Sequence, residues 1–143
     1  MTVTSRILVA LAGAALASAL AAGSAEAGTA TSPPRPVQSW DGGAVQLFPD
    51  TAADWACDKG YLCLYEHAGG RGRHLQFKDR KVVQNLTSYG FNDQMSSWRN
   101  RTAHDAFWYY DINGKGTTRR MPAGASQASL GADNDKASSI YIT

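Results

Sequence analysis

The segments Asn92–Ser97, which read NDQMSS, and Asn134–Ser139, which read NDKASS, decide the fold of this chain. Both fit the pattern N-D-x-x-S-S, and they lie 42 residues apart. Other elements upstream recur at a spacing of 44 residues: Tyr65 with the turn 70–72 recurs as Tyr109 with 114–116, and Leu86 recurs as Leu130. A duplication with nearly constant spacing indicates two copies of one supersecondary unit.

Short apolar runs at period two surround both copies of the motif. Leucines alternate with Tyr and Cys in 61–65, and Leu75 and Phe77 alternate with His74 and Gln76. Residues 107–110 are all aromatic, and isoleucines flank Tyr141. These are strand signals, and no segment sustains a helical period of about 3.6 residues. Asn113-Gly114 predicts a hairpin turn, and 82–89 is expected to hold at most one helical turn. The fold class is therefore all-β, with about four strands per copy and the two copies packed as a small sandwich.

The first 27 residues have the features of a secretory signal peptide. Arg6 precedes an uncharged run over 7–22, and Ala25-Glu26-Ala27 fits the small-x-small cleavage rule. The run is short for a membrane span. We therefore expect a secreted, extracellular protein that has no membrane attachment after cleavage.

Residues 28–54 are expected to form a flexible arm, because prolines 33, 34 and 36 stand among Thr, Ser and Ala. Val45, Leu47 and Phe48 leave two alternatives, an edge strand or simple packing across the main domain. The compact domain is expected over residues 55–143, which is long enough for one hydrophobic core.

Cys57 and Cys63 are the two cysteines of the chain. In an oxidising compartment an isolated pair at this spacing predicts a disulfide, with Cα atoms about 4.4–6.8 Å apart. Zinc would need further ligands, and no histidine is adjacent. Both thiols are therefore expected to be unavailable as nucleophiles.

The composition offers little support for an enzyme or for a nucleic-acid-binding protein. The net charge is only +2. The chain has no G-x-S-x-G nucleophile elbow and no H-E-x-x-H zinc motif. Its histidines, at positions 67, 74 and 104, are expected to be solvated. The basic run over 71–81 is expected to be a solvated strand face, so we do not expect the protein to bind nucleic acid. We also expect it to be a monomer and not an enzyme.

The repeated pattern resembles the βγ-crystallin Greek key: an aromatic residue, a glycine seven residues later, a later leucine and the N/D-N/D-x-x-S/T-S hexapeptide. Two such motifs in tandem make one βγ-crystallin domain, which is the fold that the resemblance implies. The family usually carries a second aromatic residue five positions after the first. Gly70 and Gly114 occupy those positions here.

A narrower resemblance is to small secreted metalloproteinase inhibitors of actinobacteria, which share this fold. Cys57 with the run Cys63–Glu66 matches their opening, and 91–97 matches a later segment. This resemblance implies a secreted inhibitor of extracellular zinc metalloproteases. We expect the loop between the two cysteines to enter the protease cleft, with Tyr61 and Leu62 as apolar contacts.

The hexapeptides also make calcium a candidate cofactor, because Ca²⁺ prefers about six to eight oxygen ligands. In the resembled family each ion takes ligands from both hexapeptides and from one hairpin carbonyl. That pattern implies the following candidate residues: Asn92, Asp93, Gln94 and Ser96 in one copy, Asn134, Asp135, Lys136 and Ser138 in the other, and carbonyls near Ala68 and Ile112.

Two alternatives to the inhibitor remain open at this point. Asn, Asp and Ser also cap turns with their own side chains, so the hexapeptides need not bind metal. A calcium-binding structural or stress module without a protease target is the main alternative, and a basic surface binder is another.

Overall fold

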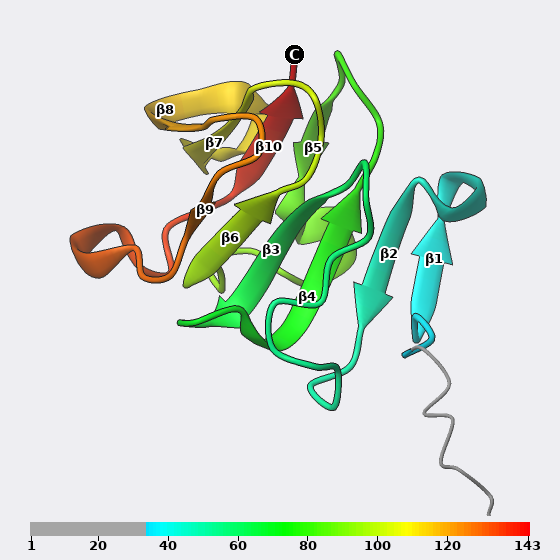
Figure 1. Cartoon of the computed structure of the whole chain (residues 1–143). Coiled ribbons are helices and arrows are strands. Elements are labelled where there is room, and N and C mark those ends of the chain that lie inside the picture. Colours follow the sequence, from blue (N-terminus) through cyan, green and yellow to red (C-terminus); the bar gives the residue numbers. More distant parts are fainter. Residues whose placement is uncertain (1–33) are drawn as a thin grey trace, which may run out of the picture. The chain divides into compact units, whose positions relative to one another are not determined.

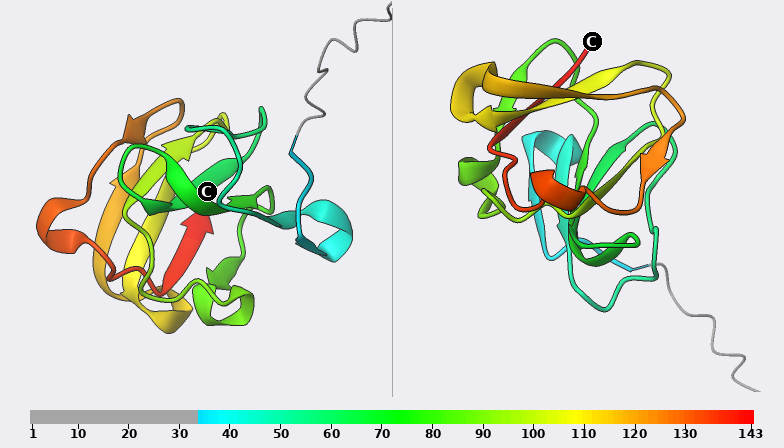
Figure 2. Two further views of the ribbon diagram at one scale, coloured as in Figure 1. Left: turned by 90° about the horizontal axis from the view of Figure 1, so that it is seen from below. Right: turned by 90° about the vertical axis from the view of Figure 1, so that its left-hand side faces the viewer.

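The computed structural model describes residues 34–143; the expected signal peptide and the first residues of the expected arm lie outside this part. The described chain forms two antiparallel sheets (Figures 1 and 2). Its strands are β1 (Gln38–Trp40), β2 (Val45–Phe48), β3 (Leu62–His67), β4 (Arg71–Phe77), β5 (Val83–Asn85), β6 (Ser97–Asn100), β7 (Ala106–Asp111), β8 (Lys115–Met121), β9 (Ser126–Gln127) and β10 (Ser139–Ile142). Short 3-10 turns are η1 (Asp41–Gly43), η2 (Leu86–Tyr89), η3 (Ile112–Gly114) and η4 (Gly131–Asp133).

Each sequence copy contributes four strands, β3 to β6 and β7 to β10, as the repeat predicts. The third strand of each copy crosses to the other sheet. The six-stranded sheet has the order β1-β2-β4-β3-β6-β9, and the four-stranded sheet has the order β5-β10-β7-β8. Neither copy can therefore complete its sheet without the other, and the all-β Greek-key prediction is confirmed.

The core lies between the two sheets and uses equivalent residues from both copies. Leu86 and Leu130, the repeated leucines, are both buried. The fourth hexapeptide residues, Met95 and Ala137, have no exposed surface. The remaining core side chains come mainly from alternate strand positions and include Leu64, Leu75, Phe77, Trp98, Trp108, Ile140 and Ile142.

The last serine of each hexapeptide closes the hairpin of its own copy. Ser97 Oγ donates to the carbonyl of His67 at 2.6 Å and accepts from the Gly70 amide at 3.0 Å. Ser139 Oγ repeats both bonds, to the Asp111 carbonyl at 2.6 Å and from the Gly114 amide at 3.1 Å. Both serines are fully buried, so this position of the motif is structural in each copy.

The domain begins earlier than the sequence predicts. Strand β2 pairs with β4, and Val45, Leu47 and Phe48 are buried. Residues 45–48 therefore do add a strand, as one alternative predicted, but β1 and not β2 lies at the edge. Assigning all of 28–54 to a flexible arm is wrong. Pro34 and Pro36 precede β1, which adds only three residues at the outer edge of the sheet, where a missing amide hydrogen costs little.

Candidate functional site

Residues 49–61, which we call the covering loop, connect β2 to β3 and cross the outer face of the six-stranded sheet (Figure 1). The predicted disulfide between Cys57 and Cys63 is present, with Cα atoms 5.9 Å apart. It ties the loop to β3. Around it a second apolar cluster forms on the outer face of the sheet, in which Trp55 and Tyr61 pack against both cysteines and Tyr65.

Trp55 fills the space that the glycine at position 70 leaves open. Its ring meets that of Tyr65 edge-on, with centroids 5.5 Å apart. A Cβ on Gly70 would lie only 2.3 Å from the indole. The Trp55 amide donates to the Gly70 carbonyl, and the Tyr65 hydroxyl donates to the Ala56 carbonyl, both at 2.8 Å. An aromatic residue from the covering loop thus stands where the family usually has one from the hairpin.

The tip of the covering loop is exposed but firmly anchored. Asp58, Lys59 and Gly60 face solvent. Arg101, the residue after β6, holds the loop. Its guanidinium donates to the Cys57 carbonyl at 2.6 Å, and its amide donates to the Tyr61 carbonyl at 2.9 Å. The Gly60 amide donates back to Arg101 at 3.0 Å. The result is a short, restrained segment with an accessible tip.

The two predicted apolar contacts do not belong to this tip. Leu62 has no exposed surface and packs in the core between the sheets, so its assignment as a protease contact is wrong. Tyr61 is half-buried, and its hydroxyl donates to the Gly43 carbonyl at 3.2 Å. Residues 62–65 are buried on both faces of β3, so the alternation in 61–65 indicates a strand and not a recognition surface.

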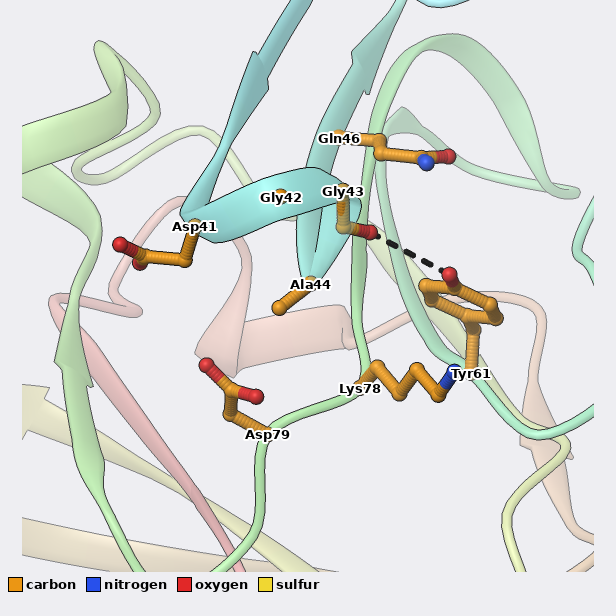
Figure 3. A pocket seen from close by; sticks show the side chains of 8 residues that line it. All are labelled: Asp41, Gly42, Gly43, Ala44, Gln46, Tyr61, Lys78 and Asp79. Carbon is orange, nitrogen blue, oxygen red and sulfur yellow. Dashed lines mark hydrogen bonds between the residues drawn. The ribbon is translucent and has the colours of Figure 1, made fainter.

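Tyr61 instead borders a shallow polar cavity of about 390 Å³ beside η1 (Figure 3). Asp41 and Asp79 line one part of it, and Lys78 lies along the Tyr61 ring at 5.9 Å from the centroid. Its lining contains no histidine, serine or cysteine.

The two hexapeptides face each other and are joined by reciprocal contacts. Ser96 Oγ lies 3.5 Å from a carboxylate oxygen of Asp135, and Ser138 Oγ lies 3.3 Å from one of Asp93. The amide of each aspartate donates to the main chain of the other hexapeptide. Both aspartates adopt positive φ, 54° and 56°, a conformation that Asp tolerates in turns. The structure thus brings the predicted oxygen donors of both copies together.

The Ser96–Asp135 pair lies in a cleft of about 370 Å³. The cleft is lined by Glu66, His67, Asp93, Gln94, Ser96, Asn134 and Asp135. The hairpin residues at this cleft are Glu66 and His67. The Ala68 carbonyl accepts from the Arg71 side chain at 3.0 Å. Ile112, the counterpart of Ala68, lies on the exposed turn η3. Neither of these two predicted residues lines the cleft.

A cation already lies next to the first hexapeptide. The Arg73 guanidinium donates to both carboxylate oxygens of Glu66, at 3.0 and 3.1 Å, and to the side-chain oxygen of Gln94 at 2.6 Å. These hydrogen bonds hold the pKa of Glu66 below its ordinary value. A positive charge here weakens the attraction of the cleft for a metal ion.

The second hexapeptide has a comparable arrangement around Tyr110. Lys136 turns over this ring, with Nζ 5.4 Å from the centroid. Arg119 forms an ion pair with Asp133 at 2.7 Å, and Asp133 accepts the hydroxyl of Tyr110. That hydrogen bond raises the pKa of Tyr110. The Lys136 ammonium is thus held over an aromatic ring.

The oxygen donors of the two hexapeptides are of the kind that calcium prefers, but only two of them are carboxylates. Asp93 and Asp135 supply carboxylates, Ser96 and Ser138 supply hydroxyls, and the Oδ1 atom of Asn92 is buried without a hydrogen-bond partner. Residues 34–143 contain no group of three or more His, Cys, Asp or Glu placed to hold a metal. Backbone carbonyls and water would have to complete the shell of about six to eight oxygens.

His74 was expected to be solvated, and this expectation is wrong. It is 1% exposed, stacked on Phe48 with centroids 4.7 Å apart, beneath the covering loop. Its Nε2 lies 3.3 Å from the side-chain nitrogen of Gln76. Burial lowers the pKa of His74 to about 4. The alternation of His74 with Leu75 indicates a strand, but the loop that covers the outward face of this strand lies outside the repeat.

The described part of the chain holds no helix of the length and apolarity that a bilayer crossing requires. No curated protein sequence matches the chain significantly. Solved structures do. A structure from work on the evolution of the eye-lens βγ-crystallin fold is 24% identical with a TM-score of 0.57, over 69% of this chain and 96% of that chain. A βγ-crystallin from Ciona intestinalis is 22% identical with a TM-score of 0.52, over 59% of this chain and all of the other.

These similarities establish the βγ-crystallin fold alone, because their sequence identities are low. The model of peptidase inhibitor family I36 matches residues 50–121, which is half of the chain. The match begins within the covering loop and ends with β8, so it includes the disulfide, the first hexapeptide and the β7–β8 hairpin. The chain therefore belongs to peptidase inhibitor family I36 and is a peptidase inhibitor with a βγ-crystallin fold, not an enzyme.

Proposed function

We propose that this inhibitor acts outside the cell on a zinc metallopeptidase and that the covering loop enters the peptidase cleft. One observation carries the choice of segment: the tip over 58–60 is exposed, while a disulfide and three hydrogen bonds involving Arg101 fix its base. Such a loop loses little conformational entropy on binding and resists cleavage. The disulfide also suits an oxidising, extracellular location.

The tip presents Asp58, Lys59 and Gly60 in place of the apolar pair predicted from sequence. Lys59 is the long side chain at the tip, and it is exposed. An exposed cation can pair with acidic groups at the rim of a peptidase cleft and steer association. The binding energy would then come from the restrained backbone and Lys59, with Tyr61 supporting the loop from behind.

A second segment has the features of a peptidase contact. Strand β8 is a seven-residue edge strand, and every residue from Lys115 to Arg120 is exposed. An edge strand presents unpaired backbone groups that can pair with an extended partner. The structure thus offers two alternatives for the contact, the covering loop and the free edge of β8.

The test is titration of the purified, disulfide-bonded protein against a thermolysin-like metallopeptidase, with serine and cysteine peptidases as controls. Replacing a hot-spot residue costs about 2 kcal/mol, or about thirtyfold in affinity. Lys59→Glu should approach that loss, whereas Lys81→Glu, an exposed lysine outside the loop, should leave inhibition unchanged. Hydrogen exchange on the complex distinguishes protection at 57–61 from protection at 115–121. Absence of inhibition of every metallopeptidase at micromolar concentration would refute the proposal.

Calcium binding between the hexapeptides is a second candidate function, favoured by the reciprocal Ser–Asp contacts and the unpartnered Asn92 oxygen. It is compatible with inhibition, because the hexapeptides are not part of the covering loop. The Arg73 and Lys136 side chains argue for weak sites. Calorimetric titration with calcium tests it directly, and absence of heat in the millimolar range would favour turn capping as the role of the motif.

A further inference from the structure

The outer face of the four-stranded sheet carries two rows of side chains that no long loop crosses, although the turn η3 bonds to Asn85 and buries Ser139 in the second row. Cross-strand partners in an antiparallel sheet share a face. Trp108 and Ile140 point into the core, so the alternate residues point outward. The first row is Val83, Tyr141, Phe107 and Arg120, and the second is Asn85, Ser139, Tyr109 and Thr118.

The internal repeat allows a direct comparison with the covered sheet. Cys63 and Tyr65, which lie beneath the covering loop, are 0% exposed. Their counterparts 44 residues later, Phe107 and Tyr109, remain partly exposed, and Val83 at the end of the first row is 39% exposed. Two of the other exposed large apolar side chains in the described chain, Val82 and Ile112, flank this face. We call it the open face.

The covered sheet also shows what the open face lacks. Trp55 lies on Tyr65 and Gly70, and the Tyr65 hydroxyl donates to the loop. At the equivalent Gly114, the atoms nearest to an added Cβ would be those of Val83 at 3.5 Å and of the Tyr109 ring at 3.8 and 3.9 Å. The Tyr109 hydroxyl makes no hydrogen bond within residues 34–143. The Tyr109 ring and Val83 thus border Gly114 themselves, and none of these nearest atoms comes from a loop that crosses the sheet, as Trp55 does at Gly70.

The charges around the two faces are complementary. The covering loop carries three acidic residues, Asp50, Asp54 and Asp58, and one basic residue, Lys59. The one charged side chain in the two rows of the open face is Arg120, which pairs with Asp105 at 2.5 Å. Lys81, two residues before Val83, is exposed at the rim. Because Arg120 is already paired with Asp105, Lys81 is the cation at this face that an acidic segment resembling the covering loop would meet.

We propose that the open face is a docking surface for an extended, acidic segment of a partner protein that carries an aromatic side chain. The aromatic ring packs on Tyr109 and Gly114 beside Val83, as Trp55 packs on Tyr65 and Gly70. A backbone carbonyl of the segment accepts the Tyr109 hydroxyl, and its carboxylates face Lys81. This surface is separate from the tip of the covering loop, so the proposal does not depend on how the inhibitor contacts its peptidase.

The probe is a capped peptide that copies residues 50–56 of the chain itself, DTAADWA, titrated into ¹⁵N-labelled protein. Saturable amide shifts are expected at Val83, Tyr109 and Gly114, with a dissociation constant of about 0.1–1 mM for so short a peptide. The same peptide with alanine in place of tryptophan should bind at least about tenfold more weakly. Tyr109→Phe should weaken binding about fivefold by removing one hydrogen bond, and Lys81→Glu by a similar factor.

Matched controls exist on the other side of the molecule. Tyr61→Phe and Lys59→Glu should leave peptide binding unchanged. The proposal is overturned by the absence of shifts at millimolar peptide, by equal binding of the tryptophan-free peptide, or by shifts centred on Tyr65 and Gly70, which would mean exchange with the covering loop. Self-association of the protein through the open face, detected by sedimentation and lost in Lys81→Glu, would also overturn it in favour of a second copy as occupant.

Discussion

Gly70→Ala should destabilise the protein far more than Gly114→Ala, although the two glycines occupy equivalent positions. Their φ angles are +69° and +68°, so alanine meets the same backbone strain at each, about 1–2 kcal/mol. The surroundings differ. The new Cβ would lie 2.3 Å from the Trp55 indole at position 70, but 3.5 Å from its nearest neighbour, Val83, at position 114. The difference between the variants therefore measures the displacement of Trp55.

The extra loss of stability in Gly70→Ala arises because the Trp55 indole must move away from the new Cβ. Overpacking that shifts a side chain costs about 1–3 kcal/mol, and loss of a buried tryptophan costs about 3–5 kcal/mol. We expect a total of about 3–5 kcal/mol for Gly70→Ala and about 1–2 kcal/mol for Gly114→Ala. At roughly 4 °C per kcal/mol for a domain of this size, the melting temperatures of the two variants should differ by about 8–12 °C.

Urea unfolding of both variants, and of each in a Trp55→Ala background, provides the assay. Without the indole, Gly70→Ala should cost no more than Gly114→Ala, because the clash is gone. A coupling energy of at least about 1 kcal/mol between positions 55 and 70 is expected. If the two single variants agree within about 0.5 kcal/mol, the reasoning that Trp55 closes the covering loop over Gly70 is refuted.

Three further predictions concern pH, calcium and the disulfide. The folded-state pKa of His74 lies near 4, below its ordinary value of 6.5. The free energy of unfolding should therefore fall by about 3 kcal/mol as pH falls from about 6.5 to about 4. In urea titrations His74→Phe should reduce this dependence on pH, and an unchanged dependence would contradict the burial of a neutral His74. Millimolar calcium should raise the melting temperature by the equivalent of about 1–2 kcal/mol if the sites are weak. The double variant Asp93→Ala, Asp135→Ala should show no rise. A wild-type melting temperature that does not change with calcium would contradict metal binding. Replacing Cys57 and Cys63 together by serine should cost about 2 kcal/mol of stability for so short a loop and should weaken inhibition through a looser tip; unchanged inhibition would point to β8 as the contact.

The sequence was sufficient for the fold because the repeat marks structurally required positions. Ser97 and Ser139 close equivalent hairpins, and Met95 and Ala137 enter the core from equivalent places. Each of these roles falls at a nearly constant distance from Tyr65 or Tyr109, within two residues between the copies. A duplication therefore shows the same constraint twice, which a single copy could not do.

The covering loop was not predictable in the same way, because it lies outside the repeat. Its apolar residues are few and widely spaced, and Trp55 packs against a glycine whose only sequence signal is a missing aromatic residue. The burial of His74 and Gln76 depends on that loop. Leu62 was assigned to recognition for a related reason, since a strand buried on both faces shows no polar face that separates core from surface.

The two copies also explain why the molecule has room for more than one interaction. Duplication produces two similar sheets, and each needs its inner face for the shared core, so only the outer faces can diverge without loss of the fold. One outer face has acquired a disulfide-linked loop that buries Tyr65 and carries an anchored, exposed tip. The other keeps Phe107, Tyr109 and Val83 accessible. An inhibitor built in this way can change its loop tip or its open face independently, because neither contributes residues to the core between the sheets.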